Sequence, residues 1–416
     1  MTPRNQNLKS LLKTFYSWLP LPAKSLVAKW LGLYPRVTNN EIKEIKSVLS
    51  TTSWNMSYSV RGKHVELEST FADYIGTEYA VAVGSGGVGI QMLIRALGLN
   101  PQSEVIIQAD TCSAVPQAIL NAQAIPVFSD VNRDTFQLCQ DDLVRKIGKN
   151  TKMVLATHMW GNPEDLDSIA ALTHENEIIV IEDACLALGS QYENKFLGSI
   201  STAGVFSFGS TKPLQAGEGG MLVTNNKELA KELRSMRSWG DRETEYGQRD
   251  VRTLSWNGRM PEVIAAIALE QLRGYPNRLA GIQRRVSKFR ELVNGLPDFR
   301  IAPTLNQEKL AYTQLAIKLT PVSRYTKQEL FNLASEESIP VFHANFEPLT
   351  ELSLFRSGDW LSWTSSKSNT LNSIPSDFPG AYDVYQNLGV GLARSNFESD
   401  RNYARLSKFI SNHFYS

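Results

Sequence analysis

Short apolar runs alternate with helical stripes along most of this 416-residue chain. Between several of the runs, apolar residues recur at helical spacing, as in Ile90, Leu93, Ile94 and Leu97 ahead of Gly98. Strands that alternate with helices in this way predict an α/β fold, with a mainly parallel seven-stranded sheet covered by helices. The predicted strands cover 79–83, 104–107, 125–128, 152–156, 178–181, 204–208 and 221–224.

The pattern changes on either side of this region. Before it, 41–50 has a helical pattern, and a second helix carries the stripe Leu67, Phe71, Tyr74 and Ile75, with Gly76 as its C-cap. After Pro261 a long helix is predicted to about residue 296, with a break near Pro276. Strands at 311–320 and around Ile339, a Ser/Thr/Asn-rich loop at 362–373 and a last helix ending near His413 follow. We therefore predict an N-terminal arm (1–40), a large α/β domain (41–295) and a small C-terminal α+β domain (296–416).

Composition narrows the class of protein. The net charge of +1 gives no support for a nucleic-acid partner. Cys112, Cys139 and Cys185 lack the spacing of a metal site or a disulfide framework, which favours a reducing cytoplasm. The N-terminal 8–34 segment is rich in Leu, Trp and Lys and is interrupted by prolines. It predicts two short amphipathic helices that pack on the body or on a partner subunit, in preference to a membrane surface.

The stretch from 177 to 221 carries the candidate chemistry. The apolar run at 178–181 delivers Asp183 to a strand end, and Lys212 follows in a glycine-rich segment with Gly217, Gly219 and Gly220. Pyridoxal phosphate needs such a pair, because a lysine forms its Schiff base and a carboxylate keeps its pyridine nitrogen protonated. The alternative is an ordinary strand-end aspartate and a solvated lysine, so the pair alone does not decide.

A glycine-rich turn, GSGGVG at 84–89, opens the helix after the first strand. It matches the dinucleotide fingerprint GxGxxG, and Asp110 stands where a ribose-binding acid would be expected. Amides at a helix N-terminus bind a pyrophosphate or a single phosphate ester equally well, so a nicotinamide oxidoreductase is a competing interpretation. Helices precede this first strand, and a nicotinamide site has no use for the Asp183–Lys212 pair. Both points favour pyridoxal phosphate.

Six ordered blocks resemble signatures of the DegT/DnrJ/StrS-type sugar aminotransferases, which are fold-type I pyridoxal-phosphate enzymes. The resemblance runs from about residue 41 to 416. The blocks are FADYIGTEYAVAVGSG, AILNAQAIPVFSDVNRDTF, HMWGNPEDLD, VIEDACLALGS, SFGSTKPLQAGEGG and WNGRMPEVIAAIALEQL. The resemblance implies a homodimeric enzyme with shared active sites.

Residue roles follow from the same resemblance. Lys212 matches the Schiff-base lysine, and Asp183 matches the aspartate that binds the pyridinium. Ser207 matches a phosphate-binding serine, and Gly86 with Gly87 matches the turn whose amides hold that phosphate. These five residues form the predicted cofactor site.

Further positions depend on a partner subunit or depart from the family pattern. Asn257 matches an asparagine that reaches the phosphate from the neighbouring subunit, and Glu218 has no assigned role. Cys112 replaces the usual aromatic residue stacked on the cofactor ring, and Leu186 replaces a glutamine near its phenolic oxygen. Gly87 itself stands where a threonine is frequent. These departures leave the substrate class open.

The implied reaction is transamination, with Lys212 moving the proton between Cα and the cofactor and glutamate as the usual donor. The usual acceptor is a keto sugar on a nucleotide, and a related keto metabolite is an option. Another pyridoxal-phosphate reaction (elimination, cyclisation or decarboxylation) would use the same pair, and a non-catalytic scaffold is a further alternative. His158, Trp160 and His343 are candidates for the acceptor pocket, with packing roles favoured for each.

Overall fold

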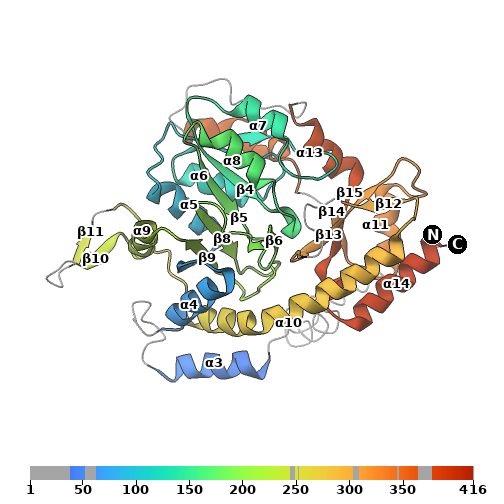
Figure 1. Ribbon diagram of the computed structural model, residues 1–416, viewed down its shortest axis with the longest axis horizontal. Coiled ribbons are helices and arrows are strands. Elements are labelled where there is room, and N and C mark those ends of the chain that lie inside the picture. Colours follow the sequence, from blue (N-terminus) through green and yellow to red (C-terminus); the bar gives the residue numbers. More distant parts are fainter. Residues whose placement is uncertain are drawn as a thin grey trace.

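A three-layer α/β body is the largest part of the molecule (Figure 1). The computed structural model describes residues 38–51, 62–243, 249–251, 253–302, 309–343, 346–363 and 377–415. The predicted arm therefore lies outside the described residues, except for its last three, as does most of the predicted 362–373 loop. Among the described residues, no helix is long and apolar enough to cross a membrane.

The central sheet has seven strands in the order β1-β9-β8-β5-β4-β2-β3. The strands from β8 to β3 are parallel, and β9 is antiparallel to both β8 and β1. The seven predicted strands are all present, each within two residues of its predicted ends. Their bounds are β1 Tyr79–Val83, β2 Glu104–Gln108, β3 Ile125–Ser129, β4 Thr151–Thr157, β5 Ile179–Asp183, β8 Ala203–Ser207 and β9 Gly220–Thr224.

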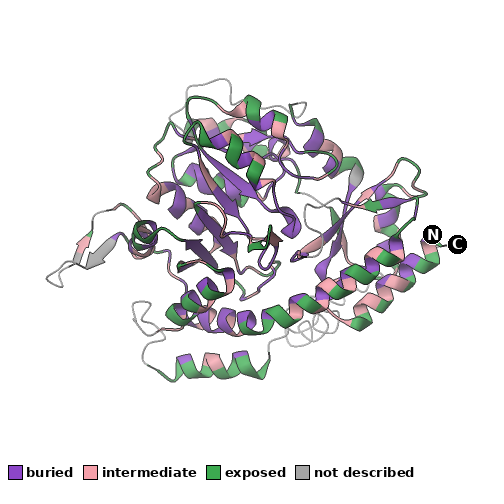
Figure 2. Cartoon of the chain, viewed as in Figure 1, coloured by how far each residue is buried: buried purple, intermediate pink, exposed green. Residues whose placement is uncertain are grey.

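Successive side chains of each strand point to opposite faces of the sheet, and this produces two separate apolar layers. In β1, Val81 and Val83 pack under one set of helices, whereas Ala80 and Ala82 pack under the other. One face is covered by α5 Gly86–Ala96, α6 Ala114–Asn121 and α9 Lys227–Arg237. The other is covered by α4 Lys63–Ile75, α7 Gln140–Lys146, α8 Leu166–His174 and the start of α10 Glu262–Val293. Figure 2 shows the strands buried between these layers.

The long helix α10 joins the two parts of the molecule. It continues through Pro276 without interruption, so the predicted break is wrong. Residues 265–279 of α10 pack in the second apolar layer of the large sheet, and residues 282–293 pack against the small sheet. At the bottom of Figure 1, α3 Asn39–Leu49 lies along α10.

The second sheet is antiparallel, in the order β12-β13-β15-β14. Its strands are β12 Phe299–Ile301, β13 Gln314–Leu319, β14 Val341–His343 and β15 Gly389–Ala393, with helices α11 Lys327–Glu336 and α14 Asp400–Phe414. The β14–β15 connection carries the short helices α12 Ser353–Arg356 and α13 Pro379–Asp383. Two small ribbons lie outside these sheets, β6 Gln191–Tyr192 with β7 Lys195–Phe196 and β10 Asp241–Glu243 with β11 Arg249–Val251.

The β14–β15 connection leaves the small sheet and packs on the large one. Phe355 and Phe378 lie edge-on to Phe128 of β3, with ring centroids 5.5 and 6.4 Å away. The Asp130 carboxylate, just after β3, accepts the N–H groups of Gly380 and Ala381, both at 2.9 Å. The predicted boundary at 295/296 stays a prediction, since the apolar layer of the large sheet also includes side chains from this connection.

Candidate active site

Three strand ends meet at one edge of the large sheet. β1, β5 and β8 point in the same direction, so Gly84, Asp183 and Ser207 lie at or just beyond their carboxyl ends. Ligands of such sheets bind at this edge. The structure therefore places the predicted cofactor residues from three segments on the same side of the molecule.

The glycine turn after β1 is packed too tightly for a side chain at one position. A Cβ atom on Gly86 would lie 3.0 Å from Cys185 Sγ and 3.2 Å from Ser207 Cβ. Ser85 caps α5 by accepting the Val88 N–H at 3.2 Å. The remaining first-turn amides have no helix carbonyl within reach, and they face the positive end of the helix dipole. This turn fits a phosphate group, because Gly86 allows a close approach of the backbone and the first-turn N–H groups of a helix bind anions.

Cys185 links the turn to the candidate catalytic pair. Its N–H donates to Asp183 Oδ1 at 3.1 Å, and the Asp183 side chain is buried. Removal from water raises the pKa of the Cys185 thiol well above its ordinary value, and the Asp183 carboxylate adds to the rise. The Lys212 ammonium acts in the opposite direction, and Cys112 also contributes. The charges of both Asp183 and Lys212 act on this thiol, and the Cys185 N–H bond fixes the Asp183 carboxylate beside it.

Lys212 lies in a closed loop between β8 and β9. The loop is tied at its base, where Ala216 N–H donates to Phe208 O and Phe208 N–H donates to Gly219 O, both at 2.9 Å. Lys212 N–H bonds to Gly209 O at 3.1 Å. These bonds hold the backbone of the loop, and Lys212 itself is half-buried.

The other residues of the predicted cofactor site differ in their burial and in their contacts near these strand ends. Leu186 is buried, and its carbonyl accepts a hydrogen bond from Thr313 Oγ1 at 2.5 Å. Cys112 is half-buried after β2, and it packs against the same apolar layer as Cys185. Gly87 has open space, since a Cβ there would meet only Ser85 Oγ at 3.9 Å.

Asn257 and Glu218 are exposed, so the single chain does not bring them into the buried part of the site. Asn257 Oδ1 accepts the Arg259 N–H at 3.3 Å, and the neighbouring Gly258 O accepts the N–H of Gly84 at 2.8 Å. Asn257 therefore lies beside the glycine turn of its own chain with its side chain facing outward.

The candidates for an acceptor pocket occupy packing positions. His158 is fully buried, and its Nδ1 accepts the Glu164 N–H at 3.1 Å. The proton is therefore on Nε2, which donates to Glu182 at 3.1 Å. Trp160 is buried edge-on against Phe136.

His343, the third pocket candidate, lies on β14 and stacks on Tyr385 with ring centroids 4.7 Å apart. Its side chain belongs to the small sheet, and the described contacts do not bring it to Asp183 or Lys212.

The sheet order excludes the dinucleotide interpretation. The glycine turn follows β1 and Asp110 follows β2, and four strands (β9, β8, β5 and β4) lie between them. At the usual strand spacing this is roughly 24 Å, too far for one ribose to bridge. Asp110 is fully buried near Glu164, where burial raises the pKa of Glu164 well above its ordinary value and Asp110 adds to the rise.

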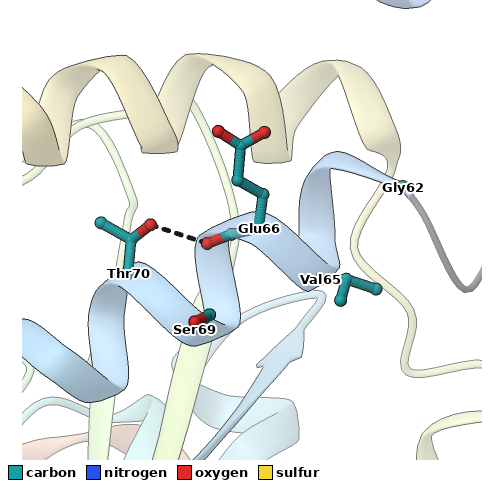
Figure 3. A pocket seen from close by; sticks show the side chains of 5 residues that line it. All are labelled: Gly62, Val65, Glu66, Ser69 and Thr70. Atoms are coloured by element: carbon teal, nitrogen blue, oxygen red, sulfur yellow. Dashed lines mark hydrogen bonds between the residues drawn. The ribbon is translucent and has the colours of Figure 1, made fainter.

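A surface hollow lies elsewhere, against the first half of α4 (Figure 3). It shares no residue with the candidate site. Thr70 Oγ1 bonds to Glu66 O at 2.8 Å within it, and Glu66 also pairs with Lys63 at 3.0 Å. The lining residues are Gly62, Val65, Glu66, Ser69 and Thr70.

Comparison with known proteins agrees with this geometry. The fold and the sheet edge define a pyridoxal-phosphate-dependent transferase. Residues 35–370 match the DegT/DnrJ/EryC1/StrS aminotransferase family, and the chain belongs to it.

Relatives support the same assignment, and a solved structure has the same fold. A GDP-perosamine synthase of Caulobacter vibrioides is 33% identical over 315 residues, which cover 74% of this chain and 83% of the relative. A GDP-perosamine synthase of Escherichia coli O157:H7 is 28% identical over 320 residues, 76% of this chain and 85% of the relative. The structure of Helicobacter pylori PseC, an aminotransferase involved in the biosynthesis of pseudoaminic acid, superposes with a TM-score of 0.80 at 20% identity. The superposition covers 92% of this chain and 98% of the PseC chain.

Sequence reasoning missed three residues at this edge. Cys185 lies two positions after Asp183, so its closeness to the site could have been inferred from the strand end. Arg278 and Arg394 bond to the carbonyls of Pro213 and Lys212, 65 and 182 residues away. No local pattern marks such long-range contacts.

Proposed function

We propose that this enzyme transfers an amino group from an amino acid donor to a keto sugar or a related keto metabolite in a biosynthetic pathway. The observation that carries the proposal is the convergence of Asp183, Lys212 and the glycine turn around Cys185. Glutamate is the expected donor. Two relatives bear the name GDP-perosamine synthase, which favours a nucleotide-linked sugar as the acceptor.

Each residue has a specific task in this proposal. Pyridoxal phosphate, when bound, supplies an electron sink for the carbanion formed at the substrate's Cα. Lys212 would hold the cofactor and, once released from it, would take the proton from the substrate's Cα and deliver it to the cofactor carbon that had carried the lysine. Asp183 holds a proton on the ring nitrogen, and its burial strengthens that charge-assisted bond. Ser207 and the amides of Gly86 and Gly87 bind the phosphate, and Cys112 and Leu186 border the ring.

The proposal is tested by the visible spectrum of the purified protein. A band from the lysine-bound cofactor that bleaches on addition of glutamate supports transamination, and Lys212→Ala must abolish it. Absence of the band from wild-type protein would overturn the proposal. A band that glutamate leaves unchanged would favour the alternative, another pyridoxal-phosphate reaction such as elimination, cyclisation or decarboxylation.

The proposed assembly is a homodimer with shared active sites, in which Asn257 reaches the partner's phosphate. The exposed Asn257 side chain supports this arrangement, as does the β10–β11 ribbon that projects from the body in Figure 1. Mixing Lys212→Ala and Asn257→Ala chains tests it. Only if the two residues of one site come from different chains does a mixed dimer contain one intact site and regain activity.

A cytoplasmic location is proposed as well, on the strength of three cysteines that form no disulfide. The thiols can be counted in freshly lysed cells by blocking them with a mass label before purification.

A further inference from the structure

Two arginines from outside the lysine loop bind its main chain. The carbonyl of Lys212 accepts a hydrogen bond from Arg394 at 3.1 Å, and the carbonyl of Pro213 accepts one from Arg278 at 3.2 Å. Pro213 and the following Leu214 are buried. Buried carbonyl groups need partners, and these two receive theirs from guanidinium groups of other elements.

Arg394 comes from the small sheet. It follows β15, is only 9% exposed, and its Nε donates to Glu398 at 3.0 Å. The carboxylate both neutralises the guanidinium and fixes its plane. The end of the small sheet is thereby joined to the peptide of Lys212.

Arg278 comes from α10 and belongs to a longer relay. Its second nitrogen donates to Gln271 Oε1 at 2.7 Å, and Gln271 Nε2 donates to Glu41 Oε1 at 2.5 Å. Glu41 is buried at the start of α3, where its other oxygen accepts the Thr38 N–H in a capping box. Burial acts to raise the pKa of Glu41, but hydrogen bonds from Thr38 and Gln271 outweigh it and the pKa is lowered.

The two guanidinium groups lie close to each other. Burial lowers the pKa of Arg278, and the charge of Arg394 adds to the effect. Placing two like charges near one lysine costs electrostatic free energy, so we expect a compensating role for them. The hydrogen bonds that fix the Lys212–Pro213 peptides are that role.

We propose that Arg394 and Arg278 are positioning residues that hold the main chain of Lys212, and that Gln271 and Glu41 extend this support to α3. Both carbonyl bonds oppose rotation of the loop, so the lysine nitrogen returns to the same point after each proton transfer. The inference rests on the proposed role of Lys212 as the cofactor lysine.

The test compares Arg394→Met and Arg278→Met in the full-length holoenzyme. Because displacement of a reacting group by about 1 Å costs up to about 100-fold in rate, we expect kcat to fall about tenfold or more in each variant. KM for glutamate should change less than about twofold, since neither arginine is placed on the donor. The pH midpoint of the cofactor band should also shift. Amide hydrogens of 209–216 should exchange at least about tenfold faster.

Arg285→Met is the matched control. Arg285 is on the same helix as Arg278. Like Arg394, it bonds to a carbonyl and a carboxylate, Phe397 O at 3.1 Å and Asp400 at 2.7 Å, away from the lysine loop. The Arg285→Met variant should have a lower melting temperature, with no change in kcat, in the cofactor band or in amide hydrogen exchange at 209–216. Gln271→Leu, which breaks the relay, should reproduce the Arg278→Met effects in weaker form.

The proposal is overturned if Arg394→Met and Arg278→Met behave like Arg285→Met, losing stability alone. Failure of the proposed function looks different. Wild-type protein would then show no cofactor band, yet the exchange of 209–216 would still rise in the two variants if the arginines hold the loop.

Discussion

The backbone N–H of Cys185 donates a hydrogen bond to the carboxylate of Asp183 at 3.1 Å. The adjacent Glu182 faces the other side of the sheet and accepts N–H groups from Gly198, Ile200 and Ser201 at 2.6–2.7 Å. Successive strand residues point to opposite faces, so two neighbouring buried carboxylates serve different parts of the protein. Substitutions of Asp183 and of Glu182 should therefore affect activity and stability separately.

Replacing Asp183 by asparagine should remove function and keep the fold. The amide oxygen can still accept the Cys185 N–H, but the charge that holds the ring proton is gone. By analogy with the loss of one preorganised electrostatic group, kcat should fall by about 10²–10³. The rate at which excess glutamate bleaches the cofactor band in a single turnover checks the loss, and calorimetry should show a nearly unchanged melting temperature. Activity near that of the wild type would contradict the role given to Asp183.

Glu182→Gln should have the opposite profile. The carboxylate is fully buried and accepts three N–H groups and His158, and glutamine can accept at only one of its two positions. Losing charge-assisted bonds there should lower the free energy of unfolding by about 2–3 kcal/mol. Denaturant titration measures this, while kcat per folded molecule should stay within about twofold. A rate loss as large as that of Asp183→Asn would show that the two carboxylates are not separable.

The glycine turn offers a matched pair one residue apart. In Gly86→Ala the new methyl group would lie 3.0 Å from Cys185 Sγ and 3.2 Å from Ser207 Cβ, so these two side chains must move by a few tenths of an ångström. We expect cofactor affinity to fall about tenfold, which corresponds to about 1.4 kcal/mol. In Gly87→Ala the nearest atom is 3.9 Å away, and affinity should be unchanged. Fluorescence titration of apoprotein with pyridoxal phosphate measures both, and equal losses would argue against the close approach at Gly86.

The thiol of Cys185 should be unreactive at neutral pH. Its raised pKa means that the thiol form persists as the pH rises through the range in which a free cysteine ionises. Only the thiolate is nucleophilic, so alkylation by iodoacetamide at pH 8 should be at least about tenfold slower than for a free thiol. The rate should increase only at more alkaline pH. Peptide mass spectrometry follows the reaction, with Cys185→Ser to identify the peptide, and rapid labelling at pH 7 would refute the assignment.

Local patterns predicted the large sheet almost completely. The run 221–224 is buried on both faces and leaves little ambiguity, and 178–181 is an apolar run that is buried or half-buried throughout. The break expected at Pro276 was wrong because the effect of proline on a helix was considered without the packing around it. Tyr275 and Leu279 on either side are buried against the large domain, and this packing outweighs the lost hydrogen bond.

The site was predictable only where its parts are local. Asp183, Ser207 and the glycine turn follow strands that the pattern identifies, so their common edge could be deduced. Arg394 and Gln271 could not, since their partners are set by the packing of α10 and the small sheet against the lysine loop. Sheet order was likewise out of reach, and it is the four intervening strands that separate Asp110 from the glycine turn.

The β14–β15 connection has a consequence for any attempt to divide the protein. It carries Phe355, Trp360 and Phe378 into the apolar layer beside Phe128. A fragment cut at residue 295 would leave those rings without their partner surface, and the remaining large domain would expose Phe128 in return. Such aromatic surfaces favour aggregation. Chimeras that exchange the C-terminal part between relatives would therefore need to exchange the β3 surface along with it.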